Sequence, residues 1–249
     1  MIALFSGTSE GRKIIKELEK NKIKTIVFTA TAYGGSLVPK SKHISINSGQ
    51  LSKEKLERIF KERKIDKILD ATHPYAETIS KTLIELSNNM KILYYRYERE
   101  DIEIEESSTI KKFSTYEEII DFLENNAGNI LLTNGSKNLH KFVKKIDKNR
   151  LHTRILPMPK YIKKTLDLGI DLKRIIGMQG PFSREINEAL IKNFEIKYMV
   201  AKNSGKEGGL EEKIEAAEET GLKLLILDKP KVNYPNKYKS INKIVENIK

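Results

Sequence analysis

Short apolar segments rich in β-branched residues alternate with amphipathic segments along almost the whole chain. Residues 2–5 predict a buried strand, and residues 8–20 predict a helix whose apolar side chains repeat at helical spacing. Residues 23–30 predict the next strand, because β-branched side chains alternate there with other residues. A chain that alternates strand and helix in this way is expected to fold as an α/β protein with parallel sheets.

The alternation continues to the end of the chain, with one interruption. Further strands are expected at residues 43–46, 67–71, 91–95, 130–133, 152–156, 174–178, 196–201 and 223–227. Helices are expected from 52, after 74, at 137–146, from 159, and at 183–193, 210–220 and 240–248, with a loop at 33–36. The interruption is a polar, acidic stretch at 98–108. We therefore expect two Rossmann-like lobes with a cleft between them, residues 1–112 binding a nucleotide and residues 113–249 completing the substrate cleft.

The charge balance raises the question of nucleic acid, because the chain carries 46 basic and 34 acidic residues. The two signs are interspersed, so the net charge of +12 favours a pocket for an anionic small molecule over nucleic acid. The chain has no cysteine, no apolar stretch of about 18 residues and no histidine pair with metal-ligand spacing. We expect a cytoplasmic protein with no membrane span and no metal site, and its oligomeric state stays open.

The first predicted strand runs directly into a glycine turn and a helix. This turn contains Gly7, Thr8, Ser9, Glu10, Gly11 and Arg12. Glycine lets the backbone approach a phosphate, which hydroxyls and free amides at a helix N-terminus can bind. The full G-x-G-x-x-G spacing is missing. The turn therefore predicts either a nucleotide-phosphate site or a tight turn with a Thr or Ser cap.

The end of the second predicted strand bears on the choice of nucleotide. Folds that select NAD commonly place an acidic side chain there to hold the ribose hydroxyls. Residues 28–32 contain Thr29 and Thr31 but no carboxylate. These hydroxyls, with Arg12 nearby, suit a 2′-phosphate better. We therefore expect NADPH as the cofactor, and NADH remains possible.

A histidine follows the strand predicted at 67–71, within Asp70-Ala71-Thr72-His73-Pro74-Tyr75-Ala76. Ligands of open α/β sheets bind at this edge. His73 is expected either to contact the substrate or donate a proton, or to be a packed or capping residue. The other histidines, His43, His140 and His152, have no comparable surroundings and are expected to be structural or exposed.

Basic residues and glycine turns also follow later strands. Arg96 and Arg99 end the strand predicted at 91–95, where they can bind carboxylates in pairs or form surface ion pairs. Glycine turns at 132–136, 179–183 and 201–209 repeat the pattern of the first turn, and Lys202 adds a positive charge. Several such turns in one chain predict a multiply anionic ligand.

Together these motifs resemble the precorrin-6A reductase family. The matching segments are 7–10, 70–76, 96–99, 177–183, 202–205, 208–209 and 228–230, in family order and across nearly the whole chain. The Ala-Thr-His-Pro-Tyr-Ala motif at 71–76 is the most specific of them. The chain departs from the family pattern at Glu100, where a proline is usual, and at Asn134, where a threonine is common.

The resemblance implies a two-lobed, NAD(P)H-dependent oxidoreductase of cobalamin biosynthesis that converts precorrin-6A or cobalt-precorrin-6A to the 6B product. Any cobalt would travel with the anionic tetrapyrrole substrate. The resemblance assigns catalytic roles to His73 and Lys202, with bound water as another possible proton donor. It assigns cofactor binding to Gly7, Thr8, Ser9, Glu10, Arg12, Thr29 and Thr72. It assigns substrate binding to Tyr75, Arg96, Arg99, Gly135, Ser136, Gln179, Ser183, Ser204, Gly205 and Gly209.

Two alternatives differ from this interpretation in class or chemistry. A nucleotide-binding sensor without turnover would keep the first turn but has no need of the motifs at 179–183 and 202–209. A tetrapyrrole methyltransferase would need an acidic residue after the second strand, and residues 29–32 supply none.

Overall fold

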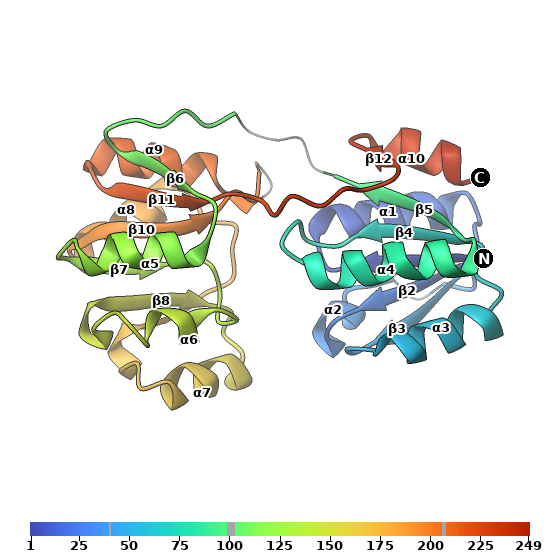
Figure 1. Ribbon diagram of the computed structural model, residues 1–249, viewed down its shortest axis with the longest axis horizontal. Helices are drawn as coiled ribbons and strands as arrows, with labels where there is room; N and C mark the ends of the chain where they lie inside the picture. Colours follow the sequence, from blue (N-terminus) through green and yellow to red (C-terminus); the bar gives the residue numbers. More distant parts are fainter. Residues whose placement is uncertain (40, 99–102, 206–207) are drawn as a thin grey trace. The chain divides into compact units, whose positions relative to one another are not determined.

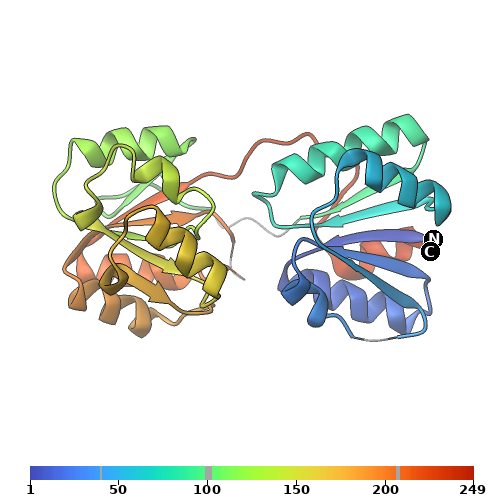
Figure 2. The ribbon, with the colours of Figure 1, turned by 90° about the horizontal axis from the view of Figure 1, so that it is seen from below.

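The predicted alternation forms two parallel β-sheets with helices on both faces (Figure 1, Figure 2). The computed structural model describes residues 1–39, 41–98, 103–205 and 208–249. The chain divides into two compact units, Met1–Glu100 with Pro230–Lys249, and Asp101–Lys229. The α/β class and the parallel sheets expected from the sequence are confirmed.

The described part of the first unit contains a six-stranded sheet in the order β12-β5-β4-β1-β2-β3, with every pair parallel. Its strands are β1 (Ile2–Ser6), β2 (Thr25–Thr29), β3 (Ile44–Ser48), β4 (Lys67–Ala71), β5 (Leu93–Tyr97) and β12 (Lys237–Tyr238). Its helices are α1 (Ser9–Lys20), α2 (Ala32–Ser36), α3 (Lys53–Glu62), α4 (Glu77–Met90) and α10 (Ile241–Ile248).

Both faces of the first sheet are buried at its central strands β1, β2 and β4, which explains why these strands are mostly apolar. One face packs on α1 and α10, in a cluster that includes Leu4 and Ile248. The other face packs on α3 and α4, in a cluster that includes Phe5, Phe60 and Leu83. β1 lies between β2 and β4, so the strand order reverses beside it. In open α/β sheets ligands bind at the carboxyl ends of the strands that flank such a reversal.

The described part of the second unit repeats this architecture, with sheet order β6-β11-β10-β7-β8-β9 and every pair parallel. Its strands are β6 (Ile110–Phe113), β7 (Asn129–Leu132), β8 (Leu151–Ile155), β9 (Ile175–Gly177), β10 (Ile196–Lys202) and β11 (Lys223–Leu227). Its α-helices are α5 (Tyr116–Glu124), α6 (Leu139–Phe142), α7 (Pro159–Asp167), α8 (Arg184–Asn193) and α9 (Glu211–Thr220). Short 3₁₀ helices, η1 (Lys148–Arg150) and η2 (Leu172–Arg174), precede β8 and β9. The strand order reverses between β7 and β10.

The division into units differs from the expected one at both ends of the second lobe. The boundary follows Glu100 instead of residue 112, because β6 pairs with β11 in the second sheet. The segment Pro230–Lys249, expected in the second lobe, belongs to the first unit. There β12 pairs with β5, and α10 packs in the cluster that contains α1.

Local differences from the expected elements are small. The loop expected at 33–36 is the one-turn helix α2, because the Thr31 side chain accepts a hydrogen bond from Gly34 N and caps it. The helix expected at 137–146 is reduced to α6. No helix in the described part of the chain is long and apolar enough to cross a membrane. Within those same residues, no group of three or more His, Asp or Glu is placed to hold a metal ion.

His152 lies in β8 and is 5% exposed, with its ring 4.6 Å from the ring of Phe194. Arg174 Nη1 donates to His152 Nε2 over 2.9 Å, so the imidazole is neutral. Burial, and then the charge of Arg174, lower the pKa of His152 to about 4. A buried histidine held neutral makes the fold sensitive to acid.

We expect His152 to make the stability of the protein fall between pH 6.5 and pH 4. A histidine in the unfolded chain has a pKa of about 6.5. The contribution of neutral His152 to the free energy of unfolding is therefore fully present above pH 6.5 and is lost as the pH falls towards the folded pKa, by up to about 3 kcal/mol. Thermal melts of wild type, His152→Gln and His140→Gln from pH 7.5 to 4.5 measure this. His140 is exposed, so its variant should follow the wild type. Equal pH slopes for wild type and His152→Gln would contradict the assignment.

Candidate active site

The turn after β1 is closed by a threonine cap. Thr8 Oγ1 accepts a hydrogen bond from Gly11 N at 3.1 Å and donates to Ala71 O at 3.4 Å, which ties the start of α1 to the end of β4. Ser9 Oγ donates to Glu10 Oε2 at 2.9 Å. Thr8 and Glu10 are both buried, and Arg12 is exposed. The capped turn expected as one alternative is therefore present, and it fixes the backbone of the residues assigned to the nucleotide.

The two glycines of this turn have different surroundings. A Cβ on Gly11 would overlap Ser6 Oγ, so glycine is required for α1 to pack against the end of β1. A Cβ on Gly7 would meet no atom within 4 Å. In dinucleotide-binding turns one glycine allows close approach of the phosphates and another allows close packing of helix and strand. Gly7 and Gly11 fit these two requirements.

The end of β2 carries hydroxyl groups that bond to one another. Thr29 Oγ1 donates to Thr31 O at 3.1 Å and lies 3.0 Å from Ser48 Oγ. A Cβ on Gly35 would overlap that same Ser48 oxygen, so α2 packs closely on β3. Thr29, which the sequence assigned to the cofactor, is 5% exposed.

Asp70, near the end of β4, is the centre of a buried hydrogen-bond network. Its side chain is fully buried and accepts from Ser80 Oγ at 2.6 Å, Tyr94 Oη at 2.7 Å and Arg96 Nη1 at 2.8 Å. It also accepts from the backbone N and the Oγ1 of Thr72, at 3.0 and 2.7 Å. Burial, followed by the charge of Asp70, raises the pKa of Tyr94, so its phenol stays protonated and donates.

Arg96 lies inside the unit, where it pairs with a carboxylate of the protein itself. Its side chain is 1% exposed, it pairs with Asp70, and its guanidinium lies 4.7 Å from the centre of the Tyr234 ring. Parallel pairing places Asp70 beside Arg96, so the two charges meet inside the unit. This burial and pairing weigh against the assignment of Arg96 to substrate carboxylates. Arg99, its expected partner in substrate binding, lies outside the described residues.

The network fixes the start of the segment that carries His73. Thr72 is half-buried and bonds to both Asp70 and Arg96, the latter from Nη1 at 3.2 Å. His73 Nδ1 accepts from Tyr75 N at 3.3 Å, and the two rings lie 5.6 Å apart. With Nδ1 accepting, the proton of the neutral imidazole lies on Nε2. His73 and Tyr75 are both half-buried at the carboxyl edge of the sheet.

The second unit places the other assigned residues at the carboxyl edge of its own sheet. Lys202 ends β10, and burial, followed by the charge of Lys137, lowers its pKa. The turns nearby need glycine, since Gly135, Gly205 and Gly209 have φ of +76°, +70° and +67°. Ser136 is half-buried, Ser204 is buried, and Gln179 and Ser183 are exposed.

Two buried basic residues of this unit were missed by sequence analysis. Arg154 in β8 is 5% exposed and Lys213 in α9 is 8% exposed. Burial lowers the pKa of Arg154 to about 10, and burial with the charge of Arg154 lowers that of Lys213 to about 8. The available signals were an arginine inside the strand predicted at 152–156 and a lysine on the inward face of a helix.

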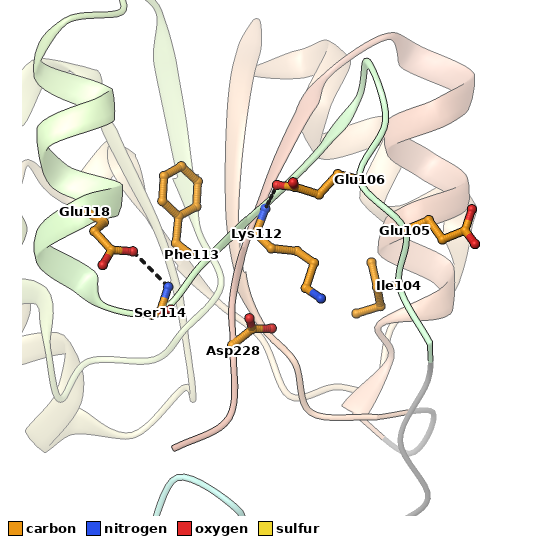
Figure 3. A pocket seen from close by; sticks show the side chains of 8 residues that line it. All are labelled: Ile104, Glu105, Glu106, Lys112, Phe113, Ser114, Glu118 and Asp228. Atoms are coloured by element: carbon orange, nitrogen blue, oxygen red, sulfur yellow. Dashed lines mark hydrogen bonds between the residues drawn. The ribbon is translucent and has the colours of Figure 1, made fainter. Parts of the chain in front are cut away.

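An open pocket of about 480 Å³ lies at the carboxyl ends of β6 and β11 (Figure 3). It is lined by Ile104, Glu105, Glu106, Lys112, Phe113, Ser114, Glu118 and Asp228. Two of its carboxylates bond to backbone: Glu106 accepts from Lys112 N, and Glu118 from Ser114 N, both at 2.9 Å. Four acidic side chains against one lysine do not suit an anionic ligand, so we do not place the substrate's carboxylates here.

Parallel sheets, a glycine turn after β1 and polar groups at the carboxyl edges are features of nucleotide-dependent α/β enzymes. The family described as precorrin-6x reductase CbiJ/CobK matches residues 1–249. Cobalt-precorrin-6A reductase of Priestia megaterium is 34% identical over 248 residues, covering 98% of this chain and 96% of that protein. The protein of the same name from Methanococcus maripaludis is 33% identical over 250 residues, covering 100% and 98%.

Among solved structures, CobK precorrin-6A reductase matches with a TM-score of 0.76 at 19% identity, covering 99% of this chain and 95% of that one. That likeness concerns the fold. The chain belongs to the precorrin-6x reductase CbiJ/CobK family. It is accordingly an oxidoreductase of cobalamin biosynthesis, and the resemblance found in the sequence is confirmed.

We expect Arg96→Met to lower the free energy of unfolding by about 3–5 kcal/mol, because it leaves the buried Asp70 carboxylate without its charged partner. The double variant Asp70→Asn with Arg96→Met should recover part of the loss. Urea unfolding followed by circular dichroism measures both. Lys141→Met, which breaks an exposed ion pair with Glu117, is the control and should change stability little. A loss for Arg96→Met as small as that of the control would show that the pair does not stabilise the unit.

Proposed function

We propose that the chain reduces cobalt-precorrin-6A to cobalt-precorrin-6B with NADPH. The observation that carries the proposal is the match to named cobalt-precorrin-6A reductases over 98–100% of this chain. The metal-free precorrin-6A is the related substrate that the family description also allows. A role in this pathway supports a cytoplasmic location.

The family uses a nicotinamide nucleotide in general, and we assign it to the first unit. The open space beside Gly7 and the amides at the start of α1 support a nucleotide phosphate there. Thr8 and Glu10 are buried and bond within the turn, so we assign them to its shape and assign phosphate contact to Gly7, Ser9 and Arg12.

The choice of NADPH rests on the end of β2. The last residues of β2 and the start of α2 contain Thr29 and Thr31 but no carboxylate that would select a free ribose hydroxyl. The exposed Arg12 at the start of α1 supplies a positive charge for a 2′-phosphate. NADH would lose this charge interaction, so we expect it to be used less well.

When bound, the nicotinamide supplies the hydride for one double bond of the macrocycle. The chain's own task is to align the two rings, exclude water and deliver a proton. Asp70 and Arg96 hold Thr72, and Thr72 leads directly to His73. We assign His73 as the proton donor. The acid is the imidazolium, which forms when Nδ1, the acceptor of the bond from Tyr75 N, takes up a proton; transfer of the Nε2 proton then leaves the neutral ring.

The second unit is assigned to the anionic substrate. Lys202, at the end of β10, is partly desolvated, and Gly205 and Gly209 after it have positive φ, which favours glycine. A macrocycle with several carboxylates needs cations of this kind, and the net charge of +12 is accounted for without nucleic acid.

We expect Gly7→Val to abolish nucleotide binding while the protein still folds. The new side chain would fill the open space beside the backbone and meet no protein atom within 4 Å at its Cβ. Calorimetric titration with NADPH and a thermal melt measure the two properties. Gly11→Ala is the matched variant and should lower the melting temperature, because its Cβ overlaps Ser6 Oγ. NADPH affinity retained by Gly7→Val would show that the turn is structural.

The proposed reaction is tested by incubating purified protein with cobalt-precorrin-6A without oxygen and following nucleotide absorbance. We expect oxidation that requires both protein and tetrapyrrole, faster with NADPH than with NADH. His73→Gln should lower kcat by about 100-fold or more, with nucleotide affinity unchanged. Faster oxidation of NADH would refute the cofactor assignment. No oxidation with this substrate or with precorrin-6A would leave nucleotide binding without turnover as the function.

A further inference from the structure

Arg154 and Lys213 are buried cations that neither the sequence motifs nor the proposed mechanism uses. Arg154 is 5% exposed and Lys213 is 8% exposed. Arg154 Nη1 donates to Asn187 Oδ1 of α8 at 2.8 Å, so its side chain lies on the face of the sheet that α8 covers. In the part of the chain that the structure describes, neither cation forms an ion pair with a carboxylate.

The partners of both cations are neutral. The Arg154 guanidinium lies 4.1 Å from the centre of the Phe182 ring, and Asn187 is held by its own bond from Nδ2 to Ser183 O at 3.0 Å. Lys213 Nζ donates to Gly208 O at 3.1 Å and Gly209 O at 2.7 Å. Dipoles orient these cations but do not cancel their charge.

The turn that contacts Arg154 through Phe182 and the turn that accepts hydrogen bonds from Lys213 lie against each other. A Cβ on Gly209 would lie 3.7 Å from Lys213 Nζ and 3.8 Å from Pro181 Cβ. The turn that contains Phe182 therefore contacts the turn whose Gly208 and Gly209 carbonyls accept from Lys213. The charge of Arg154 also lowers the pKa of Lys213, as expected for cations that are close together. Both turns follow the carboxyl ends of strands, β9 and β10.

Glu212 is an acidic side chain that faces this cluster. Its Oε2 is buried, lies 3.6 Å from the Cβ position of Gly209, and has no hydrogen-bond partner among the described residues. One carboxylate balances at most one of the two cations. A net positive charge therefore remains under the two turns.

Burial of like charges next to each other is unfavourable unless an opposite charge compensates it. The fold has no need of these cations, because the strand interior and the inward face of a helix are positions where apolar side chains serve. Arg154 also has donors beyond the one used for Asn187, arranged in the fork that binds an oxyanion through two bonds.

We propose that Arg154 and Lys213 form an oxyanion-binding site at the carboxyl edge of the second sheet. Its ligand is a carboxylate of the tetrapyrrole or a phosphate of the nucleotide, which share the chemistry that the two cations recognise. The identity of these ligands rests on the proposed function, whereas the uncompensated charge is a property of the unit itself.

The test compares Arg154→Met and Lys213→Met with the wild type in two titrations. The probes are uroporphyrin III, a stable tetrapyrrole with many carboxylates, followed by fluorescence anisotropy, and NADP⁺, followed by calorimetry. We expect each variant to bind one of the probes at least about 10-fold more weakly, the usual effect of losing a charge-assisted hydrogen bond. Lys223→Met is the matched control, because it removes the same charge from an exposed position at the start of β11.

The pattern of losses identifies the ligand. Weaker uroporphyrin binding alone assigns the site to substrate carboxylates, and weaker NADP⁺ binding alone assigns it to a phosphate. Affinities for both probes equal to those of the control would overturn the proposal. Arg154→Lys keeps the charge without the fork, so it should bind more tightly than Arg154→Met, whereas a packing role would not separate them in affinity. A wild type inactive as a reductase, with variants that still lose affinity, would refute the proposed function and leave this site standing.

Discussion

Parallel strand pairing is the constraint on which the rest of the structure depends. Every pair in both described sheets is parallel, so the carboxyl ends of all strands in a sheet lie at one edge. A parallel sheet needs a helical connection between strands, and each connection starts at that edge. Gly7 and His73 follow β1 and β4 and therefore lie at the same edge of the first sheet, although the chain separates them widely. Lys202 ends β10, at the corresponding edge of the second sheet.

The same constraint explains which parts of the site could be predicted. Turns at the ends of strands were predictable, because apolar runs followed by glycine and hydroxyl residues mark them locally. The roles of Asp70 and Arg96 were not, because they depend on the register that places the two residues side by side. An arginine at a strand end has the same sequence signature whether it points to solvent or into the unit. The return of residues 230–249 to the first unit was missed for a similar reason, since β12 has two residues and no periodicity of its own.

Structural and functional interpretations of the first turn are compatible. Thr8 is a helix cap in the ordinary sense, and its second bond, to Ala71 O, fixes the turn relative to β4. A cap of this kind uses the threonine hydroxyl but leaves the first amides of α1 oriented towards the carboxyl edge. Gly7 keeps the space next to that backbone open. The cap is therefore compatible with the phosphate site that we propose at this turn.

The two units differ in how their buried charges are compensated. We assign a supporting role to the charges of the first unit and ligand binding to those of the second. In the first unit Arg96 and Asp70 neutralise each other, and Tyr94, Ser80 and Thr72 satisfy the remaining carboxylate lone pairs. Such a network has no charge left to offer a ligand, so its function is to hold the segment that begins at Thr72. In the second unit Arg154 and Lys213 have neutral partners and one facing carboxylate, Glu212. A buried charge that the protein leaves uncompensated is stabilised when a ligand supplies the opposite charge. We therefore expect anionic groups to bind to the second unit and not at the ion pair at the end of β4.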